Sequence, residues 1–99
     1  MNPTYQVYVI ELDDAAGERA DPDKPCVYVG QSAHAPAVRL QQHLEGVHAA
    51  RVVRKHGRRL LPQLYEGRGP WIVRADAESD EARLAGELAA AGYRVFGGH

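Results

Sequence analysis

TYQVYVIEL at residues 4–12 and CVYVG at residues 26–30 are the two stretches that decide the fold of this chain. Both are rich in β-branched and aromatic residues, which favour strands. The segment between them, residues 13–25, carries acids, Gly and Pro without apolar periodicity and predicts a loop. Because consecutive strands most often lie side by side, we expect these two to form an antiparallel hairpin.

The rest of the chain changes to helical periodicity. Four apolar residues recur at helical spacing and predict the buried face of a first helix: Ala37, Leu40, Leu44 and Val47. Residues 47–56 predict a second short helix, and residues 60–65 a third strand near a sheet edge because of Pro62. Residues 77–91, rich in Ala, Leu, Glu and Arg, predict the longest helix, and residues 93–96 a terminal strand or extended segment.

These elements together predict one small α/β domain of the α+β kind, over residues 1–99, with an antiparallel three-stranded sheet flanked by helices. The 44% hydrophobic and 25% charged residues are typical of a globular domain. There is no apolar run near the roughly 20 residues of a membrane span and no signal-type N-terminus, so we expect a cytoplasmic protein without a membrane partner. Cys26 is the one cysteine, which excludes an internal disulfide.

The net charge of −1 conceals a segregation of charge along the chain. Residues 31–74 carry eight bases and two acids, whereas both flanking parts are acidic. The densest cationic cluster is Arg51, Arg54, Lys55, His56, Arg58 and Arg59. It is a candidate for contacts with the phosphates of DNA. The alternative is that cations favour a helix C-terminus, which accounts for residues 54–56 but less well for the two arginines that follow.

Glu81 is the most informative acid in the sequence. It lies three, four and seven residues before Leu84, Ala85 and Leu88, so it extends the apolar face of the predicted helix. A carboxylate rarely points inward without a partner or a metal ion. The alternative is a solvated first-turn acid that favours the helix dipole, which is the interpretation we give to Glu78 and Asp80.

Other groups suited to phosphate chemistry lie on the first helix and the two strands. Arg39 and His43 are four residues apart and share a helix face, as a phosphate-contacting pair or as an ordinary exposed face. Tyr8 and Tyr28 lie on the paired strands, as proton-handling groups or as core aromatics. The chain has no zinc-type Cys or His spacing and no GxxxxGK, GxGxxG or GxSxG motif, which argues against those site classes.

Taken in order, these residues resemble the GIY-YIG nuclease superfamily. Gln6-Val7-Tyr8 is similar to the first motif of that family and Tyr28-Val29-Gly30 to the second. Arg39, with His43 one turn on, is similar to the Arg helix, and Glu81 to the metal-binding Glu of a later helix. The resemblance runs from about residue 5 to residue 92. The chain departs from the family at Gln6, where a Gly is usual, and lacks the Asn that often follows the Glu helix; His99 is a candidate to replace it.

The resemblance implies a metal-dependent DNA endonuclease. In it, Glu81 would hold one Mg²⁺ or Mn²⁺ ion against the scissile phosphate, and Arg39 would stabilise the charge of the transition state. Tyr8 or Tyr28 would position or deprotonate the attacking water, and His43 would assist. The basic residues Arg51, Arg54, Lys55, Arg58 and Arg59 would grip DNA beside the site, with a homodimer or a partner protein supplying specificity.

Two other functions compete with this one. The missing Asn favours a nucleic-acid-binding module that has kept the fold and lost the chemistry. The near-neutral net charge favours a protein-interaction domain without a nucleic-acid role.

Overall fold

β1 (Gln6–Leu12) and β2 (Cys26–Ser32) form an antiparallel hairpin in the computed structural model, which describes residues 4–98. The register runs from Gln6 opposite Ser32 to Glu11 opposite Val27, and it places Tyr8 opposite Gly30. The predicted hairpin is therefore confirmed. The long connection contains one short 3₁₀ turn, η1 (Asp14–Ala16).

The sheet has four strands in the order β3-β1-β2-β4 and is mixed, so the predicted three-stranded antiparallel sheet is wrong in detail. β3 (Gly57–Leu60) pairs antiparallel with β1, and β4 (Arg94–Gly97) pairs parallel with β2. β4 is parallel because a helix carries the chain back along the sheet before it, as in a crossover connection. The third strand lies earlier than residues 60–65 because Pro62 begins a 3₁₀ turn, η2 (Pro62–Leu64), and proline cannot donate to a strand ladder.

Three helices accompany the sheet: α1 (Pro36–Glu45), α2 (Arg51–His56) and α3 (Arg74–Ala90). α1 ends at Gly46, whose φ of 85° is the left-handed conformation that glycine adopts without strain. The second helix was expected from residue 47, but the chain turns there and α2 begins at residue 51. α3 begins three residues earlier than the predicted helix.

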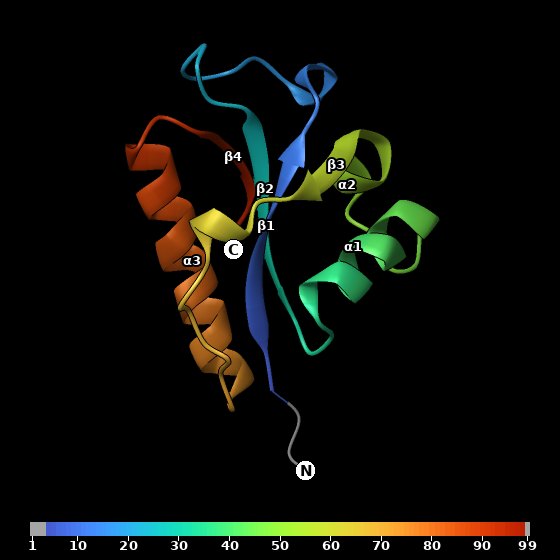
Figure 1. Ribbon diagram of the computed structural model, residues 1–99, viewed down its shortest axis with the longest axis vertical. Coiled ribbons are helices and arrows are strands. Elements are labelled where there is room, and N and C mark those ends of the chain that lie inside the picture. The colour runs from blue at the N-terminus through green and yellow to red at the C-terminus, as the bar shows by residue number, and fades with distance from the viewer. Residues whose placement is uncertain (1–3, 99) are drawn as a thin grey trace.

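The helices lie on opposite sides of the sheet. Figure 1 shows α3 on one side and α1 with α2 on the other. Successive residues of a strand face opposite sides, and the fully buried Val7, Val9 and Val29 lie on the face that α3 covers. There a Cβ on Gly98 would meet both Val29 and Ala85 of α3. Tyr8 and Ile10 lie on the other face, toward α1. Within residues 4–98, no helix is long and apolar enough to cross a membrane.

The predicted buried face of α1 is correct only at Leu40, which packs against the core. Ala37 is exposed, Leu44 is 40% exposed and Val47 is 46% exposed, whereas His43 is 1% exposed. α1 is rotated so that the imidazole, and not Leu44, meets the sheet. Burying a polar ring is tolerated only when its nitrogens are hydrogen-bonded, and both nitrogens of His43 are.

Candidate functional site

Three rings from three elements meet on the α1 side of the sheet. The ring centroids of Tyr8 and Tyr28 are 6.4 Å apart, those of Tyr8 and His43 6.2 Å, and those of Tyr28 and His43 5.6 Å. Tyr8 Oη and His43 Nε2 are joined by a hydrogen bond of 2.9 Å. Strands β1 and β2 and helix α1 therefore bring together three of the five side chains predicted for the active site.

Two glycines make room for the phenol rings. A Cβ on Gly30, directly opposite Tyr8, would lie 2.6 Å from Tyr8 Oη and 2.7 Å from its Cζ, so only glycine lets the phenol cross this strand. A Cβ on Gly97 would lie 2.8 Å from the ring of Tyr28. The Gly of the Tyr28-Val29-Gly30 motif thus has a packing reason that the sequence alone did not supply.

The hydrogen bonds of His43 determine its tautomer. The backbone N–H of Ala50 donates to His43 Nδ1 over 3.1 Å, so the proton of the neutral ring is on Nε2 and is donated to the oxygen of Tyr8. Burial, together with the nearby charge of Arg39, lowers the pKa of His43 to about 4. At neutral pH the ring is uncharged, and it acts as a donor that leaves the hydroxyl proton of Tyr8 free to point elsewhere.

Both phenols respond to the same two charges. Burial raises the pKa of Tyr8 above its ordinary value, and the charges of Tyr28 and Glu81 add to this while Arg39 opposes it. Burial also raises the pKa of Tyr28, with Glu81 again adding and Arg39 opposing. Arg39 and Glu81 are therefore close enough to bias both phenols, in opposite directions.

Arg39 is held in place by the turn that follows its own helix. Its guanidinium donates to the backbone oxygens of Val47 and His48 at 3.2 and 2.8 Å, and to Gln42 Oε1 at 3.2 Å. Guanidinium groups with fixed hydrogen bonds lose little freedom when they bind phosphate. The predicted phosphate-contacting Arg is thus oriented before any ligand arrives.

Glu81 is buried, as its place in the apolar stripe predicted. The residue is 9% exposed, and its carboxylate forms no hydrogen bond or ion pair with any residue from 4 to 98. Burial, followed by the negative charge of Glu78, raises the pKa of Glu81 to about 7. Within the described residues, Glu81 therefore has no cation beside it that would offset the cost of ionising its carboxyl group.

Asp80 contradicts the expectation of a solvated acid. It is 3% exposed, and its carboxylate accepts hydrogen bonds from Arg68 at 3.0 and 3.3 Å and from Trp71 Nε1 at 3.2 Å. Because α3 begins at Arg74, Asp80 lies in the second turn, against the loop that precedes the helix. Glu78 is exposed, as expected.

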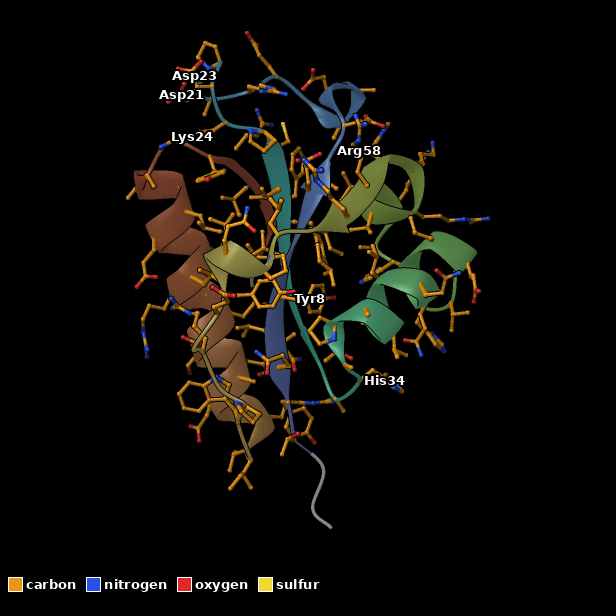
Figure 2. All side chains as sticks on the ribbon, viewed as in Figure 1. Tyr8, Asp21, Asp23, Lys24, His34 and Arg58 are labelled. Atoms are coloured by element: carbon orange, nitrogen blue, oxygen red, sulfur yellow. The ribbon has the colours of Figure 1, made fainter. Side chains whose placement is uncertain are left out.

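The predicted DNA-gripping cluster is divided by the fold. Arg51, Arg54 and Lys55 line a pocket at the end of α1, together with Gly46 and Ala49. Arg58 and Arg59 lie on β3, and both pair with Glu11 on β1, at 3.8 and 3.1 Å. Figure 2 shows Arg58 beside β3, toward the end of the sheet opposite to His34.

The donors present fit a metal ion held by one carboxylate. Residues 4–98 contain no cluster of three or more His, Cys, Asp or Glu side chains that could enclose a metal. Mg²⁺ does not need such a cage, because it commonly keeps several waters and is bound through one or two carboxylates plus substrate phosphates. Glu81 can supply that one carboxylate, and His99 lies outside the described residues.

Sequence reasoning missed several residues that shape this site. Ala50 contributes only a backbone N–H, Gly97 comes from a distant strand, and the partners of Asp80 come from a loop. Only the alternation of β1 and β2, which puts Tyr8 and Gly30 in register, was a signal in the sequence. Comparison of the chain with protein-family models, curated proteins and solved structures gave no match, so what the site does is inferred from its own geometry.

Proposed function

We propose that this chain is a metal-dependent endonuclease that hydrolyses phosphodiester bonds in DNA. The observation that carries the proposal is Glu81, a buried carboxylate whose pKa is raised to about 7 and whose charge acts on two phenols. Structural acids in a protein interior are normally paired, so one with no partner among residues 4–98 favours a functional role.

The residues around Glu81 divide the work of phosphodiester hydrolysis. A divalent cation on Glu81 would neutralise the phosphate and acidify a bound water. Arg39 holds a fixed positive charge beside the phenols and is suited to the extra negative charge of the transition state. The negative charge of Glu81 raises the pKa of both phenols. A cation bound to Glu81 would neutralise that charge and so make the phenols easier to ionise.

Tyr28 is the phenol that we assign to the attacking water. Tyr8 is 2% exposed and its oxygen already accepts a hydrogen bond from His43, whereas Tyr28 is half-buried. A group that takes a proton from water must reach that water within hydrogen-bond distance. Tyr8 and His43 then act as a rigid pair that holds the Tyr28 ring, and His43 does not serve as the base because its pKa is lowered to about 4.

Nicking of DNA tests the proposal. Supercoiled plasmid and branched DNA are incubated with the protein and Mg²⁺ or Mn²⁺ at pH 8, with EDTA as the metal-free control. We expect metal-dependent cleavage that is lost in Glu81→Gln and retained in Glu78→Gln, which removes an exposed carboxylate one turn away. Tyr28→Phe should lose more activity than Tyr8→Phe. Cleavage that persists in Glu81→Gln would show that the metal assignment is wrong.

A nucleic-acid-binding module without chemistry is the second candidate. The observation that favours it is the pocket at the end of α1 with three cationic side chains, Arg51, Arg54 and Lys55. Binding that weakens steeply with salt, with no cleavage under any metal, would decide for this function.

A further inference from the structure

A second pocket, of about 300 Å³, lies where β2 leads into α1 and α3 begins. Its polar lining comes from three parts of the chain: Gln31, Ser32, His34, Arg39, Gln42, His48 and Arg74. Figure 2 shows His34 at the start of α1, at the same end of the sheet as the first turn of α3. The pocket therefore brings together side chains that are far apart in the sequence.

The lining is cationic. It contains two guanidinium groups and two imidazoles, and none of the described lining residues is an acid. Guanidinium groups match phosphate with paired hydrogen bonds, and imidazoles add further donors. In a chain with a net charge of −1, a concave surface of this composition is suited to an anion of phosphate type.

The position of Arg74 is not explained by the stability of its helix. Arg74 is the first residue of α3, where the positive end of the helix dipole disfavours a cation. Its guanidinium lies over the ring of Tyr5, 5.5 Å from the centroid, which holds it at the pocket. Arg74 therefore places a second guanidinium at the pocket beside Arg39, an arrangement suited to an anionic ligand.

Arg39 links this pocket to the ring cluster. It lines the pocket, and its positive charge also acts on the three rings. It opposes the effect of burial on the pKa of Tyr8 and Tyr28, and it adds to the effect of burial on the pKa of His43. A ligand in the pocket is therefore a close neighbour of one above the phenols. Gln31 Oε1 is buried and has no hydrogen-bond partner in the part of the chain that the structure describes.

We propose that the pocket lined by His34, Arg39, His48 and Arg74 binds a phosphate of a polynucleotide, beside the site at which the strand is cleaved. Cleavage of the strand rests on the proposed function, whereas binding of a phosphate in the pocket does not. Arg39 is shared between the pocket and the cleavage site, and Arg74 serves the pocket alone.

Binding measured in EDTA separates this proposal from cleavage. A 15-nucleotide single strand is titrated into the wild type, Arg74→Gln and the control Arg83→Gln by fluorescence anisotropy at several salt concentrations. Arg83 lies on α3 nine residues after Arg74, which is about two and a half turns, so it is on the opposite face of the helix. Arg83→Gln therefore removes the same charge as Arg74→Gln, but away from the pocket. Arg74→Gln removes a disfavoured cation from a helix N-terminus and one exposed contact with Tyr5, so we expect the variant to fold.

We expect Arg74→Gln to weaken binding about tenfold and to reduce the salt slope by about one, with Arg83→Gln close to the wild type. Inorganic phosphate should shift the ring NMR signals of His34 and His48 in the wild type. Strands with and without a 5′-phosphate identify the source: equal binding indicates an internal diester, and preference for the phosphorylated strand indicates a terminal phosphate. Both support a phosphate site.

Two results would overturn the inference: equal binding by the two Arg variants, or His34 and His48 signals that ignore phosphate and oligonucleotide alike. If the wild type cleaves DNA and Arg74→Gln behaves as the wild type in both assays, only this inference fails. If Arg74→Gln weakens binding but no metal supports cleavage, the pocket stands and the nuclease proposal fails.

Discussion

Asp80 and Glu81 are neighbours on α3 and are buried to similar degrees, 3% and 9% exposed, yet their surroundings are opposite. Asp80 faces the loop before the helix and accepts hydrogen bonds from Arg68 and Trp71. Glu81 is about 100° further around the helix, where its charge acts on Tyr8 and Tyr28, and none of residues 4–98 pairs with it. Burial of an acid is therefore no sign of function by itself, and the feature that favours a functional role for Glu81 is that no described residue pairs with it.

Neutralising Asp80 and neutralising Glu81 should affect different properties of the protein. Asp80 stabilises the fold by tying the loop to α3, and its loss should be felt in unfolding. The buried carboxylate of Glu81 destabilises the folded protein, as residues at many functional sites do, so its removal should lower activity and not stability. Each variant below is chosen to break or sharpen that contrast.

The largest expected effect is on cleavage by Glu81→Gln. Removing the carboxylate should lower the rate of metal-dependent nicking at least about a hundredfold, because the cation loses its protein ligand. Initial rates on supercoiled plasmid at saturating Mg²⁺ give the measurement. Asp80→Asn, assayed well below its unfolding temperature, should keep most of the activity; a larger loss in Asp80→Asn would reverse the assignment of the two acids.

Next in size is the loss of stability in Asp80→Asn. The change leaves Arg68 paired only with the exposed Glu87, at 2.9 Å, and removes the negative charge that Arg68 and Trp71 share. We expect this to lower the free energy of unfolding by about 1–3 kcal/mol. Urea unfolding followed by circular dichroism at pH 7 measures it. Arg83→Gln, which removes only an exposed partner 3.7 Å from Asp80, is the matched control and should change little.

A smaller effect of opposite sign is expected for the stability of Glu81→Gln. Because the pKa of Glu81 is raised from 4.5 to about 7 on folding, the folded protein keeps a proton that the unfolded chain has lost between these values. The contribution of this group to stability is therefore present at pH 4 and is lost as the pH rises to 7 and above. At pH 8, Glu81→Gln should be more stable than the wild type by about 1–2 kcal/mol.

Unfolding curves at pH 4.5 and pH 8 check this sign. The stabilisation by Glu81→Gln should shrink toward zero at the lower pH, where the wild-type carboxyl is itself protonated. A Glu81→Gln variant that is less stable than the wild type at pH 8 would mean that the carboxylate has a structural partner after all.

The smallest expected effect is that of Glu78→Gln on Glu81. The negative charge of Glu78 is the second cause, after burial, of the raised pKa of Glu81. Glu78→Gln should therefore lower the pKa of Glu81 slightly, and the pH at which nicking reaches half its maximum should move down with it. An unchanged or higher midpoint would indicate that this midpoint reports another group.

The contrast also shows what a sequence can reveal. Glu81 was found because its apolar neighbours at three, four and seven residues are local, and a helix repeats its geometry reliably. The β1–β2 hairpin was predictable for the same reason, since strand composition is a local signal. Tyr8, Tyr28 and His43 were predicted as site residues on motif order, and their rings lie together.

Contacts between distant segments could not be predicted in this way. Arg68 reaches Asp80 from a loop whose path no periodicity describes, so the sequence predicts a solvated acid at position 80 and the structure shows a paired one. His43 replaces Leu44 on the inner face of α1 because a tyrosine 35 positions earlier and a backbone N–H beyond the helix receive it. The parallel pairing of β4 likewise depends on how α3 returns the chain, which its sequence does not encode locally.

Titration of the Glu81 side chain tests the central claim most directly. With ¹³C-labelled glutamate and aspartate, the carboxyl signals of Glu81 and Asp80 are followed from pH 4 to pH 9, with and without Mg²⁺. We predict a pKa near 7 for Glu81 in the absence of metal, a clear decrease when Mg²⁺ is saturating, and no response of Asp80 to the metal. An ordinary pKa for Glu81, or a Glu81 signal that Mg²⁺ leaves unchanged, would contradict the account.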